Sequence, residues 1–248
     1  MRSQRNIRAY LPTAFKNGAT IELDKRNIHH FHTVLRLRSD DQVILYNGTE
    51  QLEAKATITS LNKKSGALLI KEITPTKTES SLNTCLWQAV SRSDRMDFAI
   101  QKSVELGVTS IQTVTTERSP LRLKDKKLEK KMQHWQGIII SACEQSGRTQ
   151  LPTLHQPLLI DELLSKRDST RAAILLDPQA KRSLSKIDSV KDAIDILIGP
   201  EGGLTTDETS AAIAAGFIDY QLGPRILRTE TAAISVLSYL QHHFGDAA

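Results

Sequence analysis

Residues 196–208, ILIGPEGGLTTDE, combine an apolar run with a glycine-rich turn. Gly199, Gly202 and Gly203 let backbone groups approach a ligand closely, and ligands of α/β proteins favour the carboxyl ends of such strands. The turn lacks the lysine and the spacing of a phosphate cradle, and the acids in and after it would repel a polyphosphate. A ligand with a cationic sulfonium and an ammonium suffers no such repulsion. The alternative is a purely structural turn.

A second candidate segment, residues 222–233 (LGPRILRTETAA), places two arginines between a glycine turn and a predicted helix. Arg225 and Arg228 precede the helix, and Glu230 lies in its first turn. Arginines in such a position can bind an anion or stabilise a developing oxyanion. The alternative is that they pair with Glu201 or Glu230.

Cysteine and histidine give weaker signals. Cys143 closes a predicted helix without an activating base, so packing is favoured over nucleophilic catalysis. Cys85 lies far from it in the chain, and the two indicate no disulfide framework. His29, His30 and His32 lack a cysteine or an acid at metal-ligand spacing, so we expect no metal site.

Alternating strands and helices would position the two candidate segments. Four apolar runs have the length of buried strands: residues 85–90, 108–115, 172–176 and 194–198. Four segments predict helices: 94–107, with Asp94 as its cap, a long one around 128–142, 206–215 and 229–244. Thr205 and Glu208 fit a capping box at the start of the third. The alternation predicts an α/β fold with a mainly parallel sheet covered on both sides.

The first 75 residues predict a separate, small β-barrel-like module. Short runs predict strands, and the turn Asn47-Gly48 connects two of them: 7–10, 20–23, 42–46, 52–60 and 67–73. A helix is expected over 25–37, and the polar segment 74–83 predicts a linker. We therefore expect two domains, 1–75 and 76–248.

The charge distribution predicts a polyanionic partner for the N-terminal part of the chain. The net charge is +5, and residues 1–38 alone hold eight basic and two acidic side chains. No apolar run approaches the roughly 20 residues that span a bilayer, and the start has no apolar core of a secretory signal. We expect a cytoplasmic protein without a membrane partner.

These segments together resemble the RsmE-type 16S ribosomal RNA (uracil-N3) methyltransferases, a branch of the SPOUT class, over nearly the whole chain. The matching segments are 30–36, 96–108, 116–119, 142–148, 198–203 and 222–231. The last two are highly specific in combination. The resemblance implies an N-terminal PUA-like RNA-binding β-barrel and a C-terminal domain with a trefoil knot. It also implies a homodimer that uses S-adenosyl-L-methionine to methylate 16S rRNA in the small ribosomal subunit.

Carried over by position, the resemblance implies a cofactor site lined by Leu176, Gly199, Pro200, Glu201, Gly202, Gly203, Leu222, Gly223, Ile226, Leu227, Arg228, Thr231 and Ala232. Methylation at N3 of uracil requires loss of the imide proton and in-line attack on the methyl group. Arg228, followed by Arg225, is the candidate that would stabilise the charge developing on the base. Glu201, followed by Glu230, is the candidate proton acceptor.

The target base would have to leave its stack, and Arg8 and Arg36 are expected to hold RNA phosphates. Two alternatives stay open: methylation of a ribose 2′-hydroxyl, and a non-enzymatic RNA-binding or ribosome-assembly factor with the same fold. The acids around Gly199 disfavour a third, a nucleotide-binding enzyme. The sequence leaves open which uridine is modified.

Overall fold

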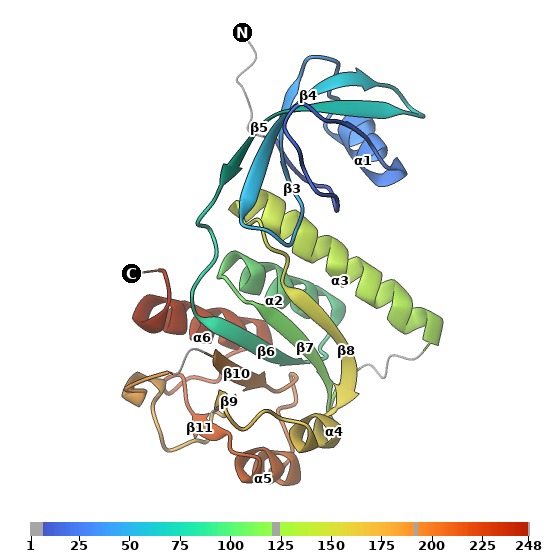
Figure 1. Cartoon of the computed structure of the whole chain (residues 1–248). Coiled ribbons are helices and arrows are strands. Elements are labelled where there is room, and N and C mark those ends of the chain that lie inside the picture. Colours follow the sequence, from blue (N-terminus) through green and yellow to red (C-terminus); the bar gives the residue numbers. More distant parts are fainter. Residues whose placement is uncertain (1–6, 121–124, 191–192, 248) are drawn as a thin grey trace. The chain divides into compact units, whose positions relative to one another are not determined.

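The computed structural model describes residues 7–120, 125–190 and 193–247, which divide into two compact units (Figure 1). One unit contains the described residues up to 79 together with 143–151. The other contains 80–142 and the residues from 152 onward. Within these described ranges, no helix has the length and apolar character needed to cross a membrane.

The first unit is built on a five-stranded sheet in the order β1-β3-β4-β5-β2. Its strands are β1 (Arg8–Tyr10), β2 (Thr20–Glu22), β3 (Gln42–Tyr46), β4 (Leu52–Leu61) and β5 (Gly66–Pro75). β1 pairs with β3 in parallel, and the other neighbours are antiparallel. Alternate side chains, among them Leu45, Ile58 and Leu68, are fully buried in one hydrophobic core. The five predicted strands are confirmed, because period-two burial is a strong signal.

The predicted helix over residues 25–37 forms as two short pieces, α1 (Lys25–His29) and the π-helical turn η1 (His30–Val34). Asp24 caps α1 by accepting a hydrogen bond from the amide of Asn27 at 2.7 Å. The helix stops early because Arg36 adopts φ 54°, outside the helical region. Leu37 is nevertheless buried, so the apolar pattern continues beyond the end of the helix.

The second unit contains a six-stranded sheet in the order β11-β9-β10-β6-β7-β8, and every neighbouring pair is parallel. Its strands are β6 (Asn83–Ala89), β7 (Ser110–Thr115), β8 (Thr153–Leu159), β9 (Ala172–Leu176), β10 (Ala193–Ile198) and β11 (Ile218–Tyr220). The predicted α/β class is confirmed. β8 was not predicted, because this edge strand contains Pro157 and buries little of its length.

Helices cover both faces of this sheet (Figure 1). They are α2 (Ser93–Glu105), α3 (Asp125–Ser146), α4 (Ile160–Ser165), α5 (Thr206–Ala214) and α6 (Thr229–Phe244), with a 3-10 turn η2 (Leu184–Lys186). α2 packs against α6, and α4 packs against α5 over buried Trp87 and Leu197. The prediction that Asp94 caps its helix was wrong. Arg92 occupies the cap, and Asp94 lies in the first turn, where its charge favours the helix dipole.

Candidate active site

Two loops meet at the carboxyl edge of the parallel sheet. Residues 199–205 follow β10, and residues 221–228 connect β11 to α6. We call them the first and second loop. The hydroxyl of Thr229, which begins α6, donates a hydrogen bond of 2.8 Å to the carbonyl oxygen of Gly199. The two segments singled out in the sequence therefore lie side by side, where parallel α/β sheets bind ligands.

Glycines fix the path of the first loop. A Cβ at Gly199 would lie 3.2 Å from the amide nitrogen of Leu204 and 3.3 Å from the carbonyl carbon of Gly203. Gly203 itself adopts φ +70°, a region that favours glycine. Its amide donates to the carbonyl oxygen of Pro200 at 2.9 Å, which closes the turn. Larger residues at 199 or 203 would distort this turn.

α5 begins with the capping box predicted from the sequence. Thr205 Oγ1 accepts from the amide of Glu208 at 3.1 Å, and the Glu208 carboxylate accepts from the amide of Thr205 at 2.9 Å. The other oxygen of Glu208 accepts from the amide of Glu117 at 2.7 Å, in the loop after β7. The buried Glu208 side chain therefore ties the ends of β7 and β10 together.

Arginines from two neighbouring segments hold the first loop. Glu201 Oε1 accepts from the amide of Arg92 at 3.0 Å and lies 3.5 Å from the guanidinium of Arg95. Arg118 Nη1 donates to the carbonyl oxygen of Gly202 at 2.9 Å. One carboxylate oxygen of Glu201 is thus committed to the shape of the loop.

The second loop presents cations and an exposed apolar side chain. Arg225 and Arg228 are exposed, and neither forms an ion pair with any described residue. The predicted alternative, pairing with Glu201 or Glu230, is therefore not observed. Ile226 between them is 85% exposed. This loop offers two arginines to a ligand or partner.

The first turn of α6 carries a buried acid. Glu230 is 9% exposed, and its Oε2 has no hydrogen-bond partner among the described residues. A buried carboxylate oxygen without a donor is unfavourable unless a ligand supplies one. The remaining predicted cofactor residues lie in three places: Leu222, Gly223 and Leu227 in the second loop, Thr231 and Ala232 at the start of α6, and Leu176 at the end of β9.

Gln88 and Thr229 were not among the site residues predicted from the sequence, yet they connect both loops to β6. Gln88 is fully buried, and its Nε2 donates to Thr229 Oγ1 at 2.8 Å and to the carbonyl oxygen of Ala89 at 3.3 Å. Its Oε1 has no partner in the described part of the chain. The available signal was a glutamine inside the apolar run LWQAV, because a buried amide needs partners.

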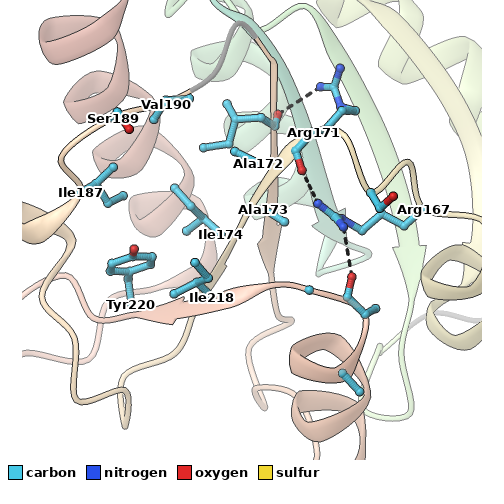
Figure 2. Close-up of a pocket in the computed structure, with 15 residues that line it drawn as sticks. Arg167, Arg171, Ala172, Ala173, Ile174, Ile187, Ser189, Val190, Ile218 and Tyr220 are labelled. Carbon is cyan, nitrogen blue, oxygen red and sulfur yellow. Dashed lines mark hydrogen bonds between the residues drawn. The ribbon is translucent and has the colours of Figure 1, made fainter.

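The cavity in Figure 2, about 360 Å³, is lined by no residue of either loop. Ala172 and Ile194 line it at the beginning of β9 and β10, so it lies toward the amino edge of the sheet. Its arginines, Arg167 and Arg171, are paired with the buried Asp195. A larger cavity of about 770 Å³ lies at the carboxyl ends of β7 and β8. Neither is lined by the second loop.

Arg8, one of the two arginines expected to hold RNA phosphates, has a largely buried side chain, 12% exposed, in the first unit. It is paired with Glu53, and its Nη2 donates to the carbonyl oxygens of Gly147 at 3.1 Å and Arg148 at 3.2 Å. Burial lowers the pKa of the Arg8 guanidinium. This placement gives Arg8 a structural role, whereas Arg36 is exposed.

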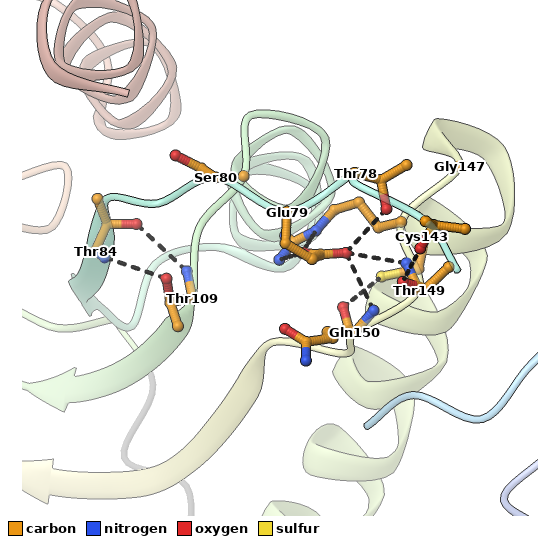
Figure 3. A network of polar contacts seen from close by, with 12 residues as sticks. Thr78, Glu79, Ser80, Thr84, Thr109, Cys143, Gly147, Thr149 and Gln150 are labelled. Carbon is orange, nitrogen blue, oxygen red and sulfur yellow. Dashed lines mark hydrogen bonds and ion pairs between the residues drawn. The ribbon is translucent and has the colours of Figure 1, made fainter. Parts of the chain in front are cut away.

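A buried polar network ties residues 143–151 to the first unit (Figure 3). Glu79 Oε1 accepts from the amide of Thr149 at 3.0 Å, and Oε2 accepts from Arg148 Nη2 at 2.7 Å. The expected linker at residues 74–83 therefore contains a buried structural carboxylate.

Cys143 is 0% exposed, and burial raises the pKa of its thiol to about 12, which disfavours a reactive thiolate. Among the described residues, no group of three His, Cys, Asp or Glu side chains could hold a metal.

Comparison with known proteins matches both units. Residues 78–241 match the RNA methyltransferase domain family, and residues 23–71 match the RNA methyltransferase PUA domain family. Ribosomal RNA small subunit methyltransferase E of Buchnera aphidicola is 34% identical over 96% of this chain and 97% of its own length. The protein of that name from Bacillus subtilis is 29% identical over 92% of this chain and 91% of its own.

Solved structures agree with the sequence relatives. A methyltransferase from Legionella pneumophila in complex with S-adenosylmethionine has a TM-score of 0.93 and 38% identity, with 98% of this chain and 99% of that chain covered. A ribosomal RNA small subunit methyltransferase E from Neisseria gonorrhoeae, also bound to S-adenosylmethionine, has a TM-score of 0.91 and 38% identity, covering 98% and 100%.

A parallel α/β unit with two loops joined at its carboxyl edge, preceded by a PUA-matching unit, defines an RNA methyltransferase. More narrowly, the chain belongs to the ribosomal RNA small subunit methyltransferase E family. The resemblance inferred from residues 198–203 and 222–231 is confirmed.

Proposed function

We propose that this protein transfers the methyl group of S-adenosylmethionine to N3 of a uridine in the 16S rRNA of the small ribosomal subunit. Its relatives are named for small-subunit ribosomal RNA, and two similar structures hold S-adenosylmethionine. The observation that carries the proposal is the hydrogen bond from Thr229 to Gly199, which joins the two loops into one site.

The residues at this edge fit the cofactor. Its sulfonium and ammonium groups are cationic, and its hydrogen-bond donors match the buried acceptor Gln88 Oε1. Because Gly199 has no Cβ, the first loop can fold back tightly at this edge. When bound, the cofactor supplies a methyl group already activated on sulfur. The residues expected to hold it are Leu176, residues 199–203, Leu222, Gly223, Ile226, Leu227, Arg228, Thr231 and Ala232.

The reaction at N3 needs stabilisation of negative charge on the base. When the imide proton leaves, charge spreads onto O2 and O4, and a guanidinium directed at one of them lowers the barrier. Arg228 is assigned this role and Arg225 is the second candidate. Both are exposed and form no ion pair with a described residue. Holding base and methyl group in register supplies much of the remaining acceleration.

Glu230 is the better candidate to accept the N3 proton. Glu201, preferred from the sequence, spends Oε1 on the amide of Arg92 and the guanidinium of Arg95. Glu230 Oε2 is buried and has no such partner among the described residues. A general base needs an oxygen that no other donor occupies, and Glu230 Oε2 meets that condition among the described residues.

The N-terminal module, residues 1–75, holds the RNA while residues 76–248 perform the transfer. The PUA-family match at 23–71 supports RNA binding by the module. The exposed Arg36 is the phosphate contact in this proposal. Because ribosomal subunits are assembled in the cytoplasm, the protein acts there.

A homodimer and a trefoil knot belong to the same proposal. Ile226 is 85% exposed on the second loop, and a second copy of the chain would cover it. The two loops joined through Thr229 are the segments that the knot would thread. Sedimentation equilibrium tests the dimer directly.

The decisive experiment identifies the methylated nucleoside. Small subunits lacking the modification are incubated with methyl-labelled S-adenosylmethionine and the protein, and the 16S rRNA is digested for mass analysis. We expect the label in 3-methyluridine, and we expect it to stay on the base when the sugar is removed. Label in a 2′-O-methyl nucleoside, or no label with intact RNA binding, contradicts the proposal and supports one of the two alternatives.

A further inference from the structure

Gln88 lies in the middle of the parallel sheet, where a polar side chain is unfavourable. β6 runs between β10 and β7, and Gln88 is in register with Ile198 on one side and Thr113 on the other. Its side chain is 0% exposed. An amide at such a position destabilises the fold unless its donors and acceptor find partners.

Both hydrogens of Gln88 Nε2 are used. One is donated to Thr229 Oγ1 at 2.8 Å and the other to the carbonyl oxygen of Ala89 at 3.3 Å. Because a carbonyl can only accept, the nitrogen must face Ala89, and the orientation of the amide is settled. The hydroxyl of Thr229 in turn donates a hydrogen bond to the carbonyl oxygen of Gly199 at 2.8 Å. Gln88 therefore fixes the Gly199 carbonyl through Thr229.

The side-chain oxygen of Gln88 is not used in this network. Gln88 Oε1 has no partner among the described residues, and neither has Oε2 of Glu230, the residue after Thr229. Both side chains are more than nine-tenths buried. Native proteins rarely leave buried acceptors unpaired. One of these oxygens belongs to the residue that hydrogen-bonds Thr229 and the other to the residue after Thr229. Unpaired acceptors on both residues indicate that a ligand brings hydrogen-bond donors to this edge.

We propose that Gln88 is a cofactor-positioning residue. Its Nε2 orients the Gly199 carbonyl through Thr229, and its Oε1 accepts a hydrogen bond from a donor group of S-adenosylmethionine. The cofactor carries such donors on its ammonium, its ribose and its adenine. This inference rests on the proposed function, and it adds a residue of β6 to a site otherwise built from the two loops.

Gln112 provides a matched control in the adjacent strand. It is 9% exposed, and its Nε2 donates to the carbonyl oxygens of Thr113 at 2.9 Å and Gln156 at 2.8 Å. These partners lie outside both loops. Replacing either glutamine with methionine removes two hydrogen bonds from a buried amide while preserving side-chain length. Gln88→Met and Gln112→Met should therefore lower the melting temperature by comparable amounts.

Titration calorimetry of the purified full-length variants with S-adenosylmethionine, and with S-adenosylhomocysteine, separates binding from stability. Gln88→Met is expected to raise both dissociation constants by about tenfold or more, as for one lost ligand hydrogen bond. Gln112→Met should stay within about twofold of the unmodified protein, well below such a loss. Unchanged affinity in Gln88→Met, or equal weakening in Gln112→Met, overturns the proposal.

Gln88→Glu adds a second readout, the pH dependence of cofactor affinity, which a purely structural role of Gln88 would not change. The carboxyl introduced keeps an acceptor, but it can donate to Thr229 only when protonated. Burial at this position favours protonation. We expect cofactor affinity of this variant to recover toward that of the unmodified protein between about pH 8 and about pH 6. An affinity that does not vary with pH, relative to the unmodified protein, contradicts the donor role.

The outcomes also distinguish this inference from the proposed function. If the unmodified protein takes up no S-adenosylmethionine, the proposed function fails and the role of Gln88 fails with it. If the unmodified protein binds the cofactor and Gln88→Met binds it equally well, only the inference about Gln88 is overturned.

Discussion

Thr229 Oγ1 and the carbonyl oxygen of Gly199 are 2.8 Å apart, and their hydrogen bond joins the start of the last helix to the turn after β10. The same hydroxyl accepts a hydrogen bond from Gln88 on β6. Three elements that are far apart in the sequence thus share one buried hydroxyl. The candidate active site is organised around this contact.

Thr229→Val should destabilise the protein by about 1–3 kcal/mol, because Gln88 Nε2 and the Gly199 carbonyl both lose a partner. Equilibrium urea denaturation measures the loss. Thr229→Ser keeps the hydroxyl and should remain close to the unmodified protein. Equal stability of the valine and serine variants would show that the hydroxyl does not hold the loops together.

Arg228→Ala should abolish methyl transfer while cofactor affinity changes by no more than a few fold. Its guanidinium acts on charge that develops during the reaction, so its loss affects turnover rather than binding. Initial rates on unmodified small subunits and calorimetry with S-adenosylmethionine provide the two readouts. Arg182→Ala removes another exposed arginine, one that is paired with Asp219, and should leave both unchanged. Full activity of Arg228→Ala would exclude Arg228 from the mechanism.

Glu230→Gln should reduce the rate of methyl transfer by roughly 100-fold or more, as expected when a general base is lost. Glu201→Gln should cost less activity, because Glu201 Oε1 is committed to Arg92 and Arg95. Single-turnover kinetics under saturating cofactor compares the two variants. A larger defect in Glu201→Gln would restore the order expected from the sequence alone.

Arg36 and Arg8 should respond differently to mutation. Arg36→Glu is expected to weaken RNA binding and to reduce the slope of log affinity against log salt by about one or more. Arg8→Ala should instead destabilise the first unit by about 1–3 kcal/mol, because Glu53 and the carbonyl oxygens of Gly147 and Arg148 lose a donor. Filter binding across a salt series and thermal unfolding test the pair. An unaltered salt slope in Arg36→Glu would argue against that surface.

The secondary structure was largely predictable where burial is continuous along a strand or where a capping motif marks a helix start. The apolar runs of β9 and β10, buried on both faces, and the capping box at Thr205 gave correct elements. β8 was missed because an edge strand buries too little to show a pattern. The helix at 25–37 was predicted too long because Leu37 is buried without being helical. The hydrophobic pattern of a short segment indicates which residues are buried, but not the backbone conformation that buries them.

The candidate site was predictable as two segments but not as a network. The glycine turn at 199 and the arginines of the second loop carry their chemistry in residue type, which a sequence displays. The role of Gln88 depends on a partner 141 positions away, and the interior position of Arg8 depends on carbonyl groups 139 and 140 positions away. Such contacts exist only after the sheet has formed.

Hydrogen exchange with and without S-adenosylmethionine tests most directly whether the two loops form the cofactor site. We predict that the cofactor slows amide exchange in residues 199–205 and in residues 221–232 together, with little change around the cavity lined by Ala172 and Ile194. Protection confined to that cavity or to only one of the two loops, or no uptake of the cofactor at all, would contradict the account.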